Sequence, residues 1–269
     1  MLYEVFEPPA ELAPYVRFFW ALESDVAPGE EYVHRSLADG CVEVVFHYRS
    51  AFDEITSTGS VETSPIASIQ AQSTRYRRFV TREGFGIFGA YLYPFAIPKL
   101  LSIPAYEFTN ITPDLESVLG KQGRLIEQRV CGAIDNAARV RILSDFFCLK
   151  LRRSNIDIHP VFHSIHEILS SKGLVDIDTL AADQGLSRRQ FERRFKELAG
   201  LAPKLYSRVV RFQAATEQKV LGTKDLTQIA YSCGYYDQSH FINDFREFSG
   251  YSPKEYFWQV AEGTQYIDV

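Results

Sequence analysis

Cysteine is scarce in this sequence, and the cysteines it has lie far apart. Cys41, Cys131, Cys148 and Cys233 make no CxxC motif and no other close pair. Their spacing excludes a cysteine zinc site and a disulfide framework, and it is typical of reduced thiols in a cytoplasmic protein.

Long apolar runs are missing as well. No stretch approaches the ~20 apolar residues that cross a bilayer, and the N-terminus, MLYEVFEPPAELAPY, has neither the basic start nor the apolar core of a secretion signal. The chain has 269 residues, of which 46% are apolar and 23% charged, which is ordinary for a globular protein with room for two domains. We therefore expect a cytoplasmic protein with no membrane partner.

The sequence also lacks the motifs of several enzyme classes. It has no P-loop and no GxSxG, and GFGIFG (Gly84 to Gly89) lies within a predicted strand instead of opening a helix. His34 and His47 are the histidines of the strand-rich region and form no HxH pair, which argues against a cupin-type metal site. We expect neither a metal nor another cofactor, and no enzymatic activity.

A further histidine group is spaced to line one helix face. His159, His163 and Glu167 follow one another at intervals of four residues, as a metal site on a helix would require. Pro160, however, is expected to begin the helix and to leave His159 outside it. We interpret these side chains as solvated helix surface.

Positive charge is concentrated near the C-terminus. The whole chain carries a net charge of −5, but residues 181–260 hold 12 basic and 9 acidic residues, whereas residues 1–180 carry a net −6. Five of the ten residues from Ser187 to Lys196 are basic. This asymmetry indicates a nucleic-acid partner for the C-terminal part of the chain, which the total charge conceals.

The first part of the chain predicts strands and the later part helices. CVEVVFHY (Cys41 to Tyr48) and FGIFGAYLY (Phe85 to Tyr93) are rich in β-branched and aromatic residues. In the first of these, Val42, Val44, Phe46 and Tyr48 share one face, and Cys41, Glu43, Val45 and His47 share the other. Helix formers dominate after Asp114, and a linker is predicted from Ser154 to Pro160. The fold class is therefore predicted to be α+β.

One sixteen-residue pattern occurs twice. FERRFKELAGLAPKLY (Phe191 to Tyr206) and FINDFREFSGYSPKEY (Phe241 to Tyr256) agree at Phe, Phe, Glu, Gly, Pro, Lys and Tyr. Upstream, LAADQGL (Leu180 to Leu186) pairs with IAYSCGY (Ile229 to Tyr235). A repeat of this kind is one supersecondary unit used twice.

Each unit is predicted to be a helix, a tight turn and a second helix. Gly185 and Gly234 suit the turn because glycine adopts the left-handed conformation cheaply, and Ser187 and Asp237 suit the N-cap of the helix that follows. The second helices carry phenylalanines four residues apart, which predict a buried stripe. The opposite faces carry side chains that suit base edges and phosphates: Arg189, Arg193 and Lys196 in one unit, and Ser239, Asn243 and Arg246 in the other. Two helix-turn-helix units would present these faces to neighbouring major grooves; the alternative is a merely solvated surface.

The segment from about Val161 to Phe257 resembles the DNA-binding domain of AraC/XylS-type transcription regulators. The resemblance rests on LSRRQFERRFKELAGLAPKLYSRVVR (Leu186 to Arg211), on Ala230, and on CGYYDQSHFINDFREFSGYSPKEY (Cys233 to Tyr256). It implies that a long helix, here from Pro203 to about Leu221, joins the two units.

The resemblance also implies which residues read bases: Arg189, Glu192, Arg193, Gln238, Ser239, His240 and Asn243. Asn243 stands where some members carry arginine, so the base it prefers is open. Glu192 suits cytosine N4 and equally an ion pair with Arg188 or Lys196. Basic residues around the two units are candidate phosphate or groove contacts: Arg188, Lys196, Lys204, Arg208, Arg211, Arg246 and Lys254.

The N-terminal part resembles, less specifically, the uncharacterised sensor domains that precede this DNA-binding domain. PPAELAPYVRFFWALES, LADG before an apolar strand, and YLYPFAIPKLLSIPAYEFTN carry the resemblance. It implies a small β-barrel that holds an effector, followed by helices that dimerise. Glu43 and His47, on one strand face, and Trp20 are candidate pocket residues; the alternatives are a solvated face for the first two and a core position for Trp20.

These patterns predict three segments: a β-rich, barrel-like sensor domain at residues 1–110, a helical connector at 111–153, and an AraC-type DNA-binding domain at 158–260. We expect a bacterial, sequence-specific transcription regulator with DNA, a small-molecule effector and RNA polymerase as partners. The connector carries an apolar stripe, formed by Val140, Leu143, Phe147 and Leu151. We expect a homodimer through this stripe, unless the stripe packs on its own barrel. One rival function is an enzyme with an appended DNA-binding domain, which the acidic neighbours of Cys41 disfavour. The other is an effector-free DNA-binding dimer.

Overall fold

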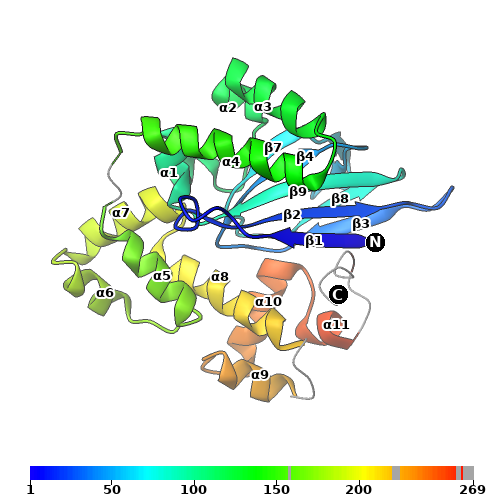
Figure 1. Cartoon of the computed structure of the whole chain (residues 1–269). Helices are drawn as coiled ribbons and strands as arrows, with labels where there is room; N and C mark the ends of the chain where they lie inside the picture. The colour runs from blue at the N-terminus through cyan, green and yellow to red at the C-terminus, as the bar shows by residue number, and fades with distance from the viewer. Residues whose placement is uncertain (157–158, 220–224, 259–261, 263–269) are drawn as a thin grey trace.

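Two antiparallel sheets form the N-terminal part of the chain. The computed structural model describes residues 1–156, 159–219, 225–258 and 262 (Figure 1). The first sheet has the strand order β1-β2-β9-β4-β7 and the second the order β3-β8-β5-β6. The strands are β1 (Leu2–Phe6), β2 (Val16–Ser24), β3 (Tyr32–Ser36), β4 (Val42–His47), β5 (Asp53–Ile55), β6 (Val61–Thr63), β7 (Ala67–Gln70), β8 (Arg77–Thr81) and β9 (Phe85–Leu92).

Strand β4 shows how the first sheet is built. Its side chains alternate as the sequence predicts: Val42, Val44 and Phe46 belong to a core between the sheet and the covering helices. Val45 belongs to a smaller aromatic cluster with residues of both sheets, including Ile87 of β9. One face of the strand is therefore core, and the other faces the interior between the two sheets.

Helices from the middle of the chain cover the outer face of the first sheet (Figure 1). They are α1 (Ala96–Leu101), the 3-10 helix η1 (Ala105–Phe108), α2 (Leu115–Leu119), α3 (Lys121–Cys131) and α4 (Asn136–Arg153). Helix α4 begins at the N-cap Asp135, whose carboxylate accepts from the backbone N–H of Ala138 at 2.6 Å.

The apolar stripe of α4 packs on the barrel. Leu143 and Phe147 are buried in the same core as the outer face of β4, and Val140 and Leu151 pack against that core. Burial of this stripe within the chain corrects the prediction that it forms a homodimer interface. An apolar stripe predicts that something covers it, and here the covering surface is the chain's own sheet.

The C-terminal part is helical and contains the two predicted units. Its elements are α5 (Phe162–Ser170), α6 (Ile177–Asp183), α7 (Arg188–Ala199), α8 (Pro203–Thr216), the 3-10 helix η2 (Glu217–Lys219), α9 (Leu226–Ser232), α10 (Gln238–Ser249) and α11 (Pro253–Trp258). Helix α5 begins after His159, as expected from Pro160. No helix in the described part of the chain has the length and apolar character needed to cross a membrane.

The local signals of both helix-turn-helix units are confirmed. Gly185 and Gly234 have φ values of 62° and 72°, in the left-handed region that favours glycine. The hydroxyl of Ser187 caps α7 in a capping box with Gln190, and the carboxylate of Asp237 caps α10. Turn and cap together fix where each second helix begins.

The helix between the two units is shorter than predicted. Helix α8 ends at Thr216 after 14 residues, which corresponds to ~21 Å at 1.5 Å per residue. The 3-10 turn η2 follows it, and the predicted end near Leu221 lies outside the described residues. The α-helical spacer is therefore about three-quarters of the length expected from the sequence.

The two parts of the chain share one core. Ala38, between β3 and β4, and Phe95, just before α1, are buried in the same cluster as Phe191, Tyr206 and other residues of the C-terminal helices. The N-terminal part is thus packed directly against the helices that would meet DNA.

Candidate functional site

The N-terminal part of α7 presents basic side chains to solvent. Arg189 and Arg193 are exposed on the helix, and Phe191 and Phe195 are fully buried on its other face. The amphipathic pattern therefore places the basic residues outward, as the sequence predicts. The C-terminal end of α7 is covered, because the hydroxyl of Thr109 donates to the carbonyl oxygen of Gly200 at 3.0 Å.

Helix α10 presents the second predicted face. Gln238, Ser239 and Asn243 are exposed, while Phe241 and Phe245 are fully buried. Nδ1 of His240, which is also exposed, lies 2.9 Å from Oδ2 of the N-cap Asp237. This contact leaves the other nitrogen of the ring directed away from the cap.

Glu192 forms one of its two predicted contacts, the ion pair with Arg188. Its Oε1 accepts from Nε of Arg188 at 3.0 Å, and Arg188 also donates to the carboxylate of Asp178 on α6 at 3.0 Å. The ion pair is formed in the structure, and both side chains are engaged. A base contact by Glu192 would require it to exchange this partner.

Five of the seven predicted phosphate or groove contacts fall into two groups. Lys204, Arg246 and Lys254 are exposed on α8, α10 and α11. Arg208 and Arg211 make internal contacts: Nη2 of Arg208 donates to Asp244 at 2.6 Å and to Glu247 at 2.7 Å, and Arg211 donates to the carbonyl oxygen of Gly173 at 3.1 Å. Arg208 thus connects α8 to α10, and Arg211 connects α8 to the turn that precedes α6.

Lys196 lies at the boundary between the two parts of the chain. It is exposed on α7, and its ammonium nitrogen is 5.8 Å from the ring centroid of Tyr106 in η1. Lys196, which is predicted to touch the DNA groove, thus also lies near Tyr106 of the N-terminal part of the chain.

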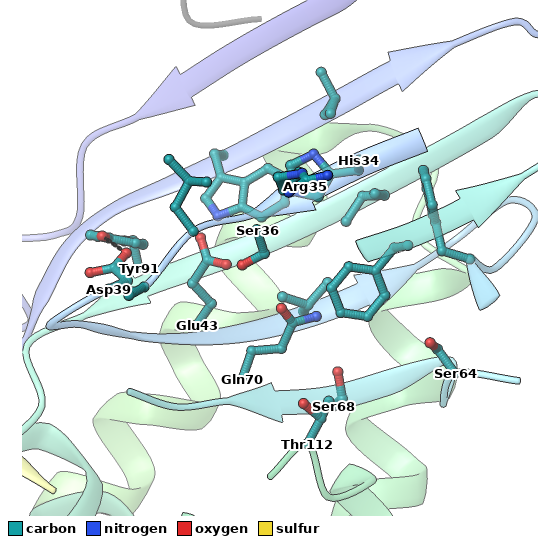
Figure 2. A pocket seen from close by; sticks show the side chains of 18 of the residues that line it. His34, Arg35, Ser36, Asp39, Glu43, Ser64, Ser68, Gln70, Tyr91 and Thr112 are labelled. Atoms are coloured by element: carbon teal, nitrogen blue, oxygen red, sulfur yellow. Dashed lines mark hydrogen bonds between the residues drawn. The ribbon is translucent and has the colours of Figure 1, made fainter. Parts of the chain in front are cut away.

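A cavity of about 300 Å³ lies between the two sheets. Figure 2 shows the labelled polar side chains that line it, Glu43 among them. Glu43, His47 and Trp20, the candidate pocket residues of the sequence, all line it. Polar residues that the sequence did not single out line it as well: His34, Ser36, Asp39, Ser68, Gln70, Tyr91 and Thr112.

Strand register explains which side chains meet in this wall. Glu43 on β4 lies opposite Gln70 on β7 and opposite Tyr91 on β9, and Tyr91 lies opposite Phe18 on β2. The rings of Phe18 and Tyr91 stack with centroids 4.9 Å apart. Directly opposite residues on one face are the closest neighbours in a sheet, so Glu43 has an aromatic pair on one side and an amide on the other.

The next row of the wall has room for the Trp20 indole. Trp20 lies opposite Gly89, and a Cβ added at Gly89 would lie 2.5 Å from the indole. The glycine therefore permits the ring to lie over β9 towards β4. Trp20 also approaches Tyr3, with ring centroids 6.5 Å apart.

The Glu43 carboxyl has an unusual electrostatic environment. Burial raises its pKa to about 8, and the nearby Asp39 adds to this, while the indole N–H of Trp20 opposes it. Among the described residues the indole N–H lies near the carboxylate without completing a hydrogen bond. The exposed part of Glu43 faces the cavity it lines.

His47 is the second polar group of β4 that lines the cavity. Its side chain is 7% exposed, and its Nδ1 has no hydrogen-bond partner among the described residues. Burial and the neighbouring His34 lower its pKa to about 4. The ring is therefore neutral near pH 7 and keeps an unused hydrogen-bonding atom.

The C-terminal helices close the cavity. Phe212, Gln213 and Thr216 of α8 line it, although more than a hundred residues separate them from the strands. The loop that carries Asp39 is held by the same helices: the N–H of Ala38 donates to the carbonyl oxygen of Phe248 at 3.0 Å, and Gly40 packs on the ring of Tyr206.

Cys41 lies two residues from each of the cavity residues Asp39 and Glu43. Burial and the nearby Asp39 raise the pKa of Cys41 to about 12, so its thiol stays protonated near neutral pH. Within residues 1–156, 159–219, 225–258 and 262, no group of three or more histidine, cysteine, aspartate or glutamate side chains is placed to hold a metal ion.

Residues 180–259 match the family model described as "Helix-turn-helix domain". The chain is also 35% identical, across 78 residues, to the HTH-type transcriptional regulator ArgR of Pseudomonas aeruginosa. The C-terminal part of the chain is a helix-turn-helix domain of the AraC type. The AraC-type domain thus contains both repeated units, from Leu180 in α6 to the end of α11.

Two further relatives are similar to part of the chain. The chain is 33% identical over 81 residues to the HTH-type transcriptional activator RhaS of Escherichia coli, and 31% identical over 105 residues to the F1 operon positive regulatory protein of Yersinia pestis. These alignments cover 29%, 30% and 38% of this chain for ArgR, RhaS and the F1 operon protein. The chain spans only 24%, 29% and 35% of the length of these curated relatives.

The N-terminal part and the whole chain have further matches. Residues 4–114 match the family model described as "Domain of unknown function (DUF6597)". Among solved structures, ToxT from Vibrio cholerae aligns over 89% of this chain and 98% of its own, with 14% identity and a TM-score of 0.49. The DNA-binding domain of AdpA in complex with a target DNA aligns over 36% of this chain and 89% of its own, with 29% identity and a TM-score of 0.35.

Proposed function

We propose that this protein is a bacterial transcription regulator that binds a specific DNA site and whose affinity for that site is set by a small molecule in the cavity. The observation that carries the proposal is the position of α8. This helix joins the two helix-turn-helix units and at the same time supplies Phe212, Gln213 and Thr216 to the cavity wall.

DNA recognition is proposed for the exposed faces of α7 and α10. Arg189 and Arg193 suit guanine edges, and Asn243 suits adenine, because each can form two hydrogen bonds with these bases in the major groove. The two faces differ, so the two halves of the site should differ in sequence. One protomer then recognises an asymmetric site, with RNA polymerase as the partner at the promoter and the cytoplasm as the place of action.

Phosphate contacts are proposed for the exposed lysines and arginines around these faces. Lys204, Arg246 and Lys254 are free to reach the backbone, whereas Arg208 and Arg211 are engaged within the domain. Counterions released from DNA by such contacts make affinity fall with salt. We therefore leave Arg208 and Arg211 out of the proposed contact set.

Control by a ligand follows from what the cavity touches. Three connections lead from its walls to the AraC-type domain: α8 itself, the Ala38–Phe248 hydrogen bond, and Arg35 of β3, which donates to the carbonyl oxygen of Ser249. A ligand that binds one arrangement of α8 better than another shifts the population of that arrangement, and with it the affinity for DNA.

The enzyme alternative needs a reactive group in the cavity. The raised pKa of Cys41 leaves it without a thiolate near neutral pH, and the relatives named above are called regulators or activators of transcription. We therefore favour binding over catalysis for this cavity.

The test uses the full chain and a site selected from random DNA. Two half-sites one helical turn apart should be protected together, and inserting about five base pairs between them should weaken binding by roughly 100-fold or more, because one half-site moves to the opposite face of the duplex. Equal binding to the expanded site would show that only one unit recognises DNA. Failure to select any sequence above random DNA would overturn the proposal itself.

A further inference from the structure

We infer that the ligand of the cavity is a small organic cation, a protonated or quaternary amine with an apolar body, held by Glu43 against the aromatic wall. The inference rests on the proposed function, since it names the chemical class of the effector. It is carried by the arrangement of Glu43, its aromatic neighbours and the unpaired nitrogen of His47.

The first observation is a carboxylate without a cation. Glu43 lines the cavity in a row between Gln70 and Tyr91, and among the described residues no basic side chain contributes to its electrostatic environment. Asp39, which also lines the cavity, adds a second negative group nearby. A buried carboxylate is costly unless it is paired, and a cationic ligand would supply the missing charge.

The second observation is that Arg35, which lines the cavity, and Arg17, which lies over Tyr91, already have other partners. The guanidinium of Arg35 donates to Ser249 O and to Glu262, outside the cavity. Arg17 donates to Sγ of Cys41 and lies over the rings of Tyr91 and Tyr93. Neither arginine forms a hydrogen bond to Glu43 in the described part of the chain, so the carboxylate remains available to a ligand.

The third observation is the aromatic wall. Phe18 and Tyr91 form a stacked pair beside Glu43, and Trp20 and Tyr3 form the next layer. The faces of aromatic rings carry negative charge density and attract cations, tryptophan most strongly. The same rings accept the apolar body of the ligand, and the volume of about 300 Å³ suits a small molecule.

The fourth observation is His47, which points to a ligand independently of the carboxylates. Its ring lines the cavity, is more than nine-tenths buried, and has an unpaired Nδ1 among the described residues. Unpaired buried polar atoms are rare in folded proteins and are usually satisfied by a ligand or by water. Because burial keeps this ring neutral, it can hydrogen-bond to the ligand without repelling its positive charge.

The experiment compares amines with alcohols of the same skeleton on the full-length protein. Propylamine, benzylamine and phenethylamine are titrated calorimetrically near pH 8, each against the matching alcohol, with benzoate as the anionic probe. At least one amine should bind roughly tenfold or more tighter than its alcohol, and benzoate should bind weakest. If no amine binds, or if an alcohol or benzoate binds as tightly as the best amine, the inference is overturned.

Two variants assign the preference to residues. Glu43→Gln keeps the shape of the side chain, and it should bring the affinities for amine and alcohol to within about twofold of each other. The matched control is Glu62→Gln, at an exposed glutamate on β6, which should leave the preference unchanged. If Glu43→Gln is poorly folded, Trp20→Leu serves instead and should weaken the amine more than the alcohol. A preference unchanged in the folded variants would overturn the inference.

DNA binding is measured separately on the same preparations. Selective DNA binding without amine preference would overturn the inference and leave the proposed DNA-binding function standing. Amine preference without selective DNA binding would overturn the proposed DNA-binding function and leave the amine preference of the cavity standing. Because calorimetry is run without DNA, failure of one measurement does not cause failure of the other.

Discussion

The guanidinium of Arg35 donates a hydrogen bond to the carbonyl oxygen of Ser249, 214 residues later in the chain, at 3.1 Å. Arg35 also lies over the rings of Tyr76 and Tyr251, 4.5 Å and 4.0 Å from their centroids. Strand β3 carries His34 and Ser36 into the cavity wall, and Arg35, the residue between them, therefore connects the strand to the C-terminal end of α10.

Arg35→Ala should loosen α10 from the N-terminal part. The loss of a buried hydrogen bond and of two aromatic contacts should cost about 2–3 kcal/mol of unfolding free energy, and amide hydrogens of α10 should exchange faster. Arg82→Ala is the control, because Arg82 forms an exposed ion pair with Glu31 at 3.1 Å and should cost less than about 1 kcal/mol. Equal exchange in both variants would show that Arg35 does not couple the two parts.

Asn243→Ala should weaken specific DNA binding by about 1–3 kcal/mol and leave binding to random DNA nearly unchanged. Asn243 is exposed on α10 opposite the buried Phe241 and Phe245, so the substitution leaves the core intact. Competition titrations against the selected site and a random duplex measure the difference. The same loss on both duplexes would mean that Asn243 does not read a base.

Lys204→Ala should change the salt dependence of DNA affinity, whereas Arg208→Ala should change the stability of the fold. Lys204 is exposed, and its removal should reduce the slope of log affinity against log salt by roughly one unit on every sequence. Arg208 is held by Asp244 and Glu247, and its removal leaves the buried Asp244 unpaired. That variant should lose about 1–3 kcal/mol of stability, less than a wholly buried pair because Arg208 is partly exposed.

Thermal unfolding and salt titrations of both variants distinguish these roles. A lowered salt slope for Arg208→Ala at unchanged stability would return Arg208 to the phosphate contacts. An unchanged slope for Lys204→Ala would remove Lys204 from them.

Affinity for a quaternary amine should rise with pH. Benzyltrimethylammonium carries no titratable proton, whereas Glu43 has a pKa raised to about 8 and is mostly protonated near pH 6. Affinity should therefore increase by up to tenfold per pH unit below about pH 8 and level off above it. Calorimetry should also detect a proton released on binding near pH 7.

The pH dependence of affinity can be assigned to Glu43 because several neighbouring groups keep their charge in this pH range. The pKa of Tyr3 and that of Tyr91 are raised by burial, and His47 has a pKa lowered to about 4, so none of them changes charge between about pH 6 and 8. Asp39 and His34 also line the cavity. Glu43→Gln isolates the contribution of Glu43, and a pH profile that persists in this variant would assign the titration to another group.

Phe147→Asp should destabilise the chain instead of producing a soluble monomer. Phe147 is 2% exposed in the core beneath α4, so a buried carboxylate replaces a ring, at about 3–5 kcal/mol. Leu149→Asp on the same helix is the control, because Leu149 is 46% exposed. Denaturant titration followed by far-ultraviolet circular dichroism compares them, and equal stability would place Phe147 outside the core.

The sequence predicts the AraC-type domain well because its signals are local. The turn glycines, the caps Ser187 and Asp237, and the phenylalanines four residues apart each depend on neighbours within one helical turn or two. The alternation of β4 is equally local, and it separates Glu43 and His47 from the core face of the sheet.

What the sequence could not predict depends on contacts between distant segments. Phe212 has the pattern of an ordinary core residue of α8, and only packing on the barrel brings it to the cavity. The stripe of α4 shows the same limit, since Leu143 and Phe147 would have the same spacing under a partner chain or under their own sheet. The partners of Arg208 on α10 likewise follow from helix packing, which periodicity does not specify.

Under the proposed function, helix α8 must meet two requirements at once. Its length and direction set the distance between the two DNA-binding units, and its side chains Phe212, Gln213 and Thr216 shape a ligand cavity. A lineage that acquires a new effector by changing these side chains thereby disturbs the spacing of its operator, and the reverse also holds. Ligand and operator should therefore diverge together among descendants of this protein, and regulators that keep the same α8 residues should keep both.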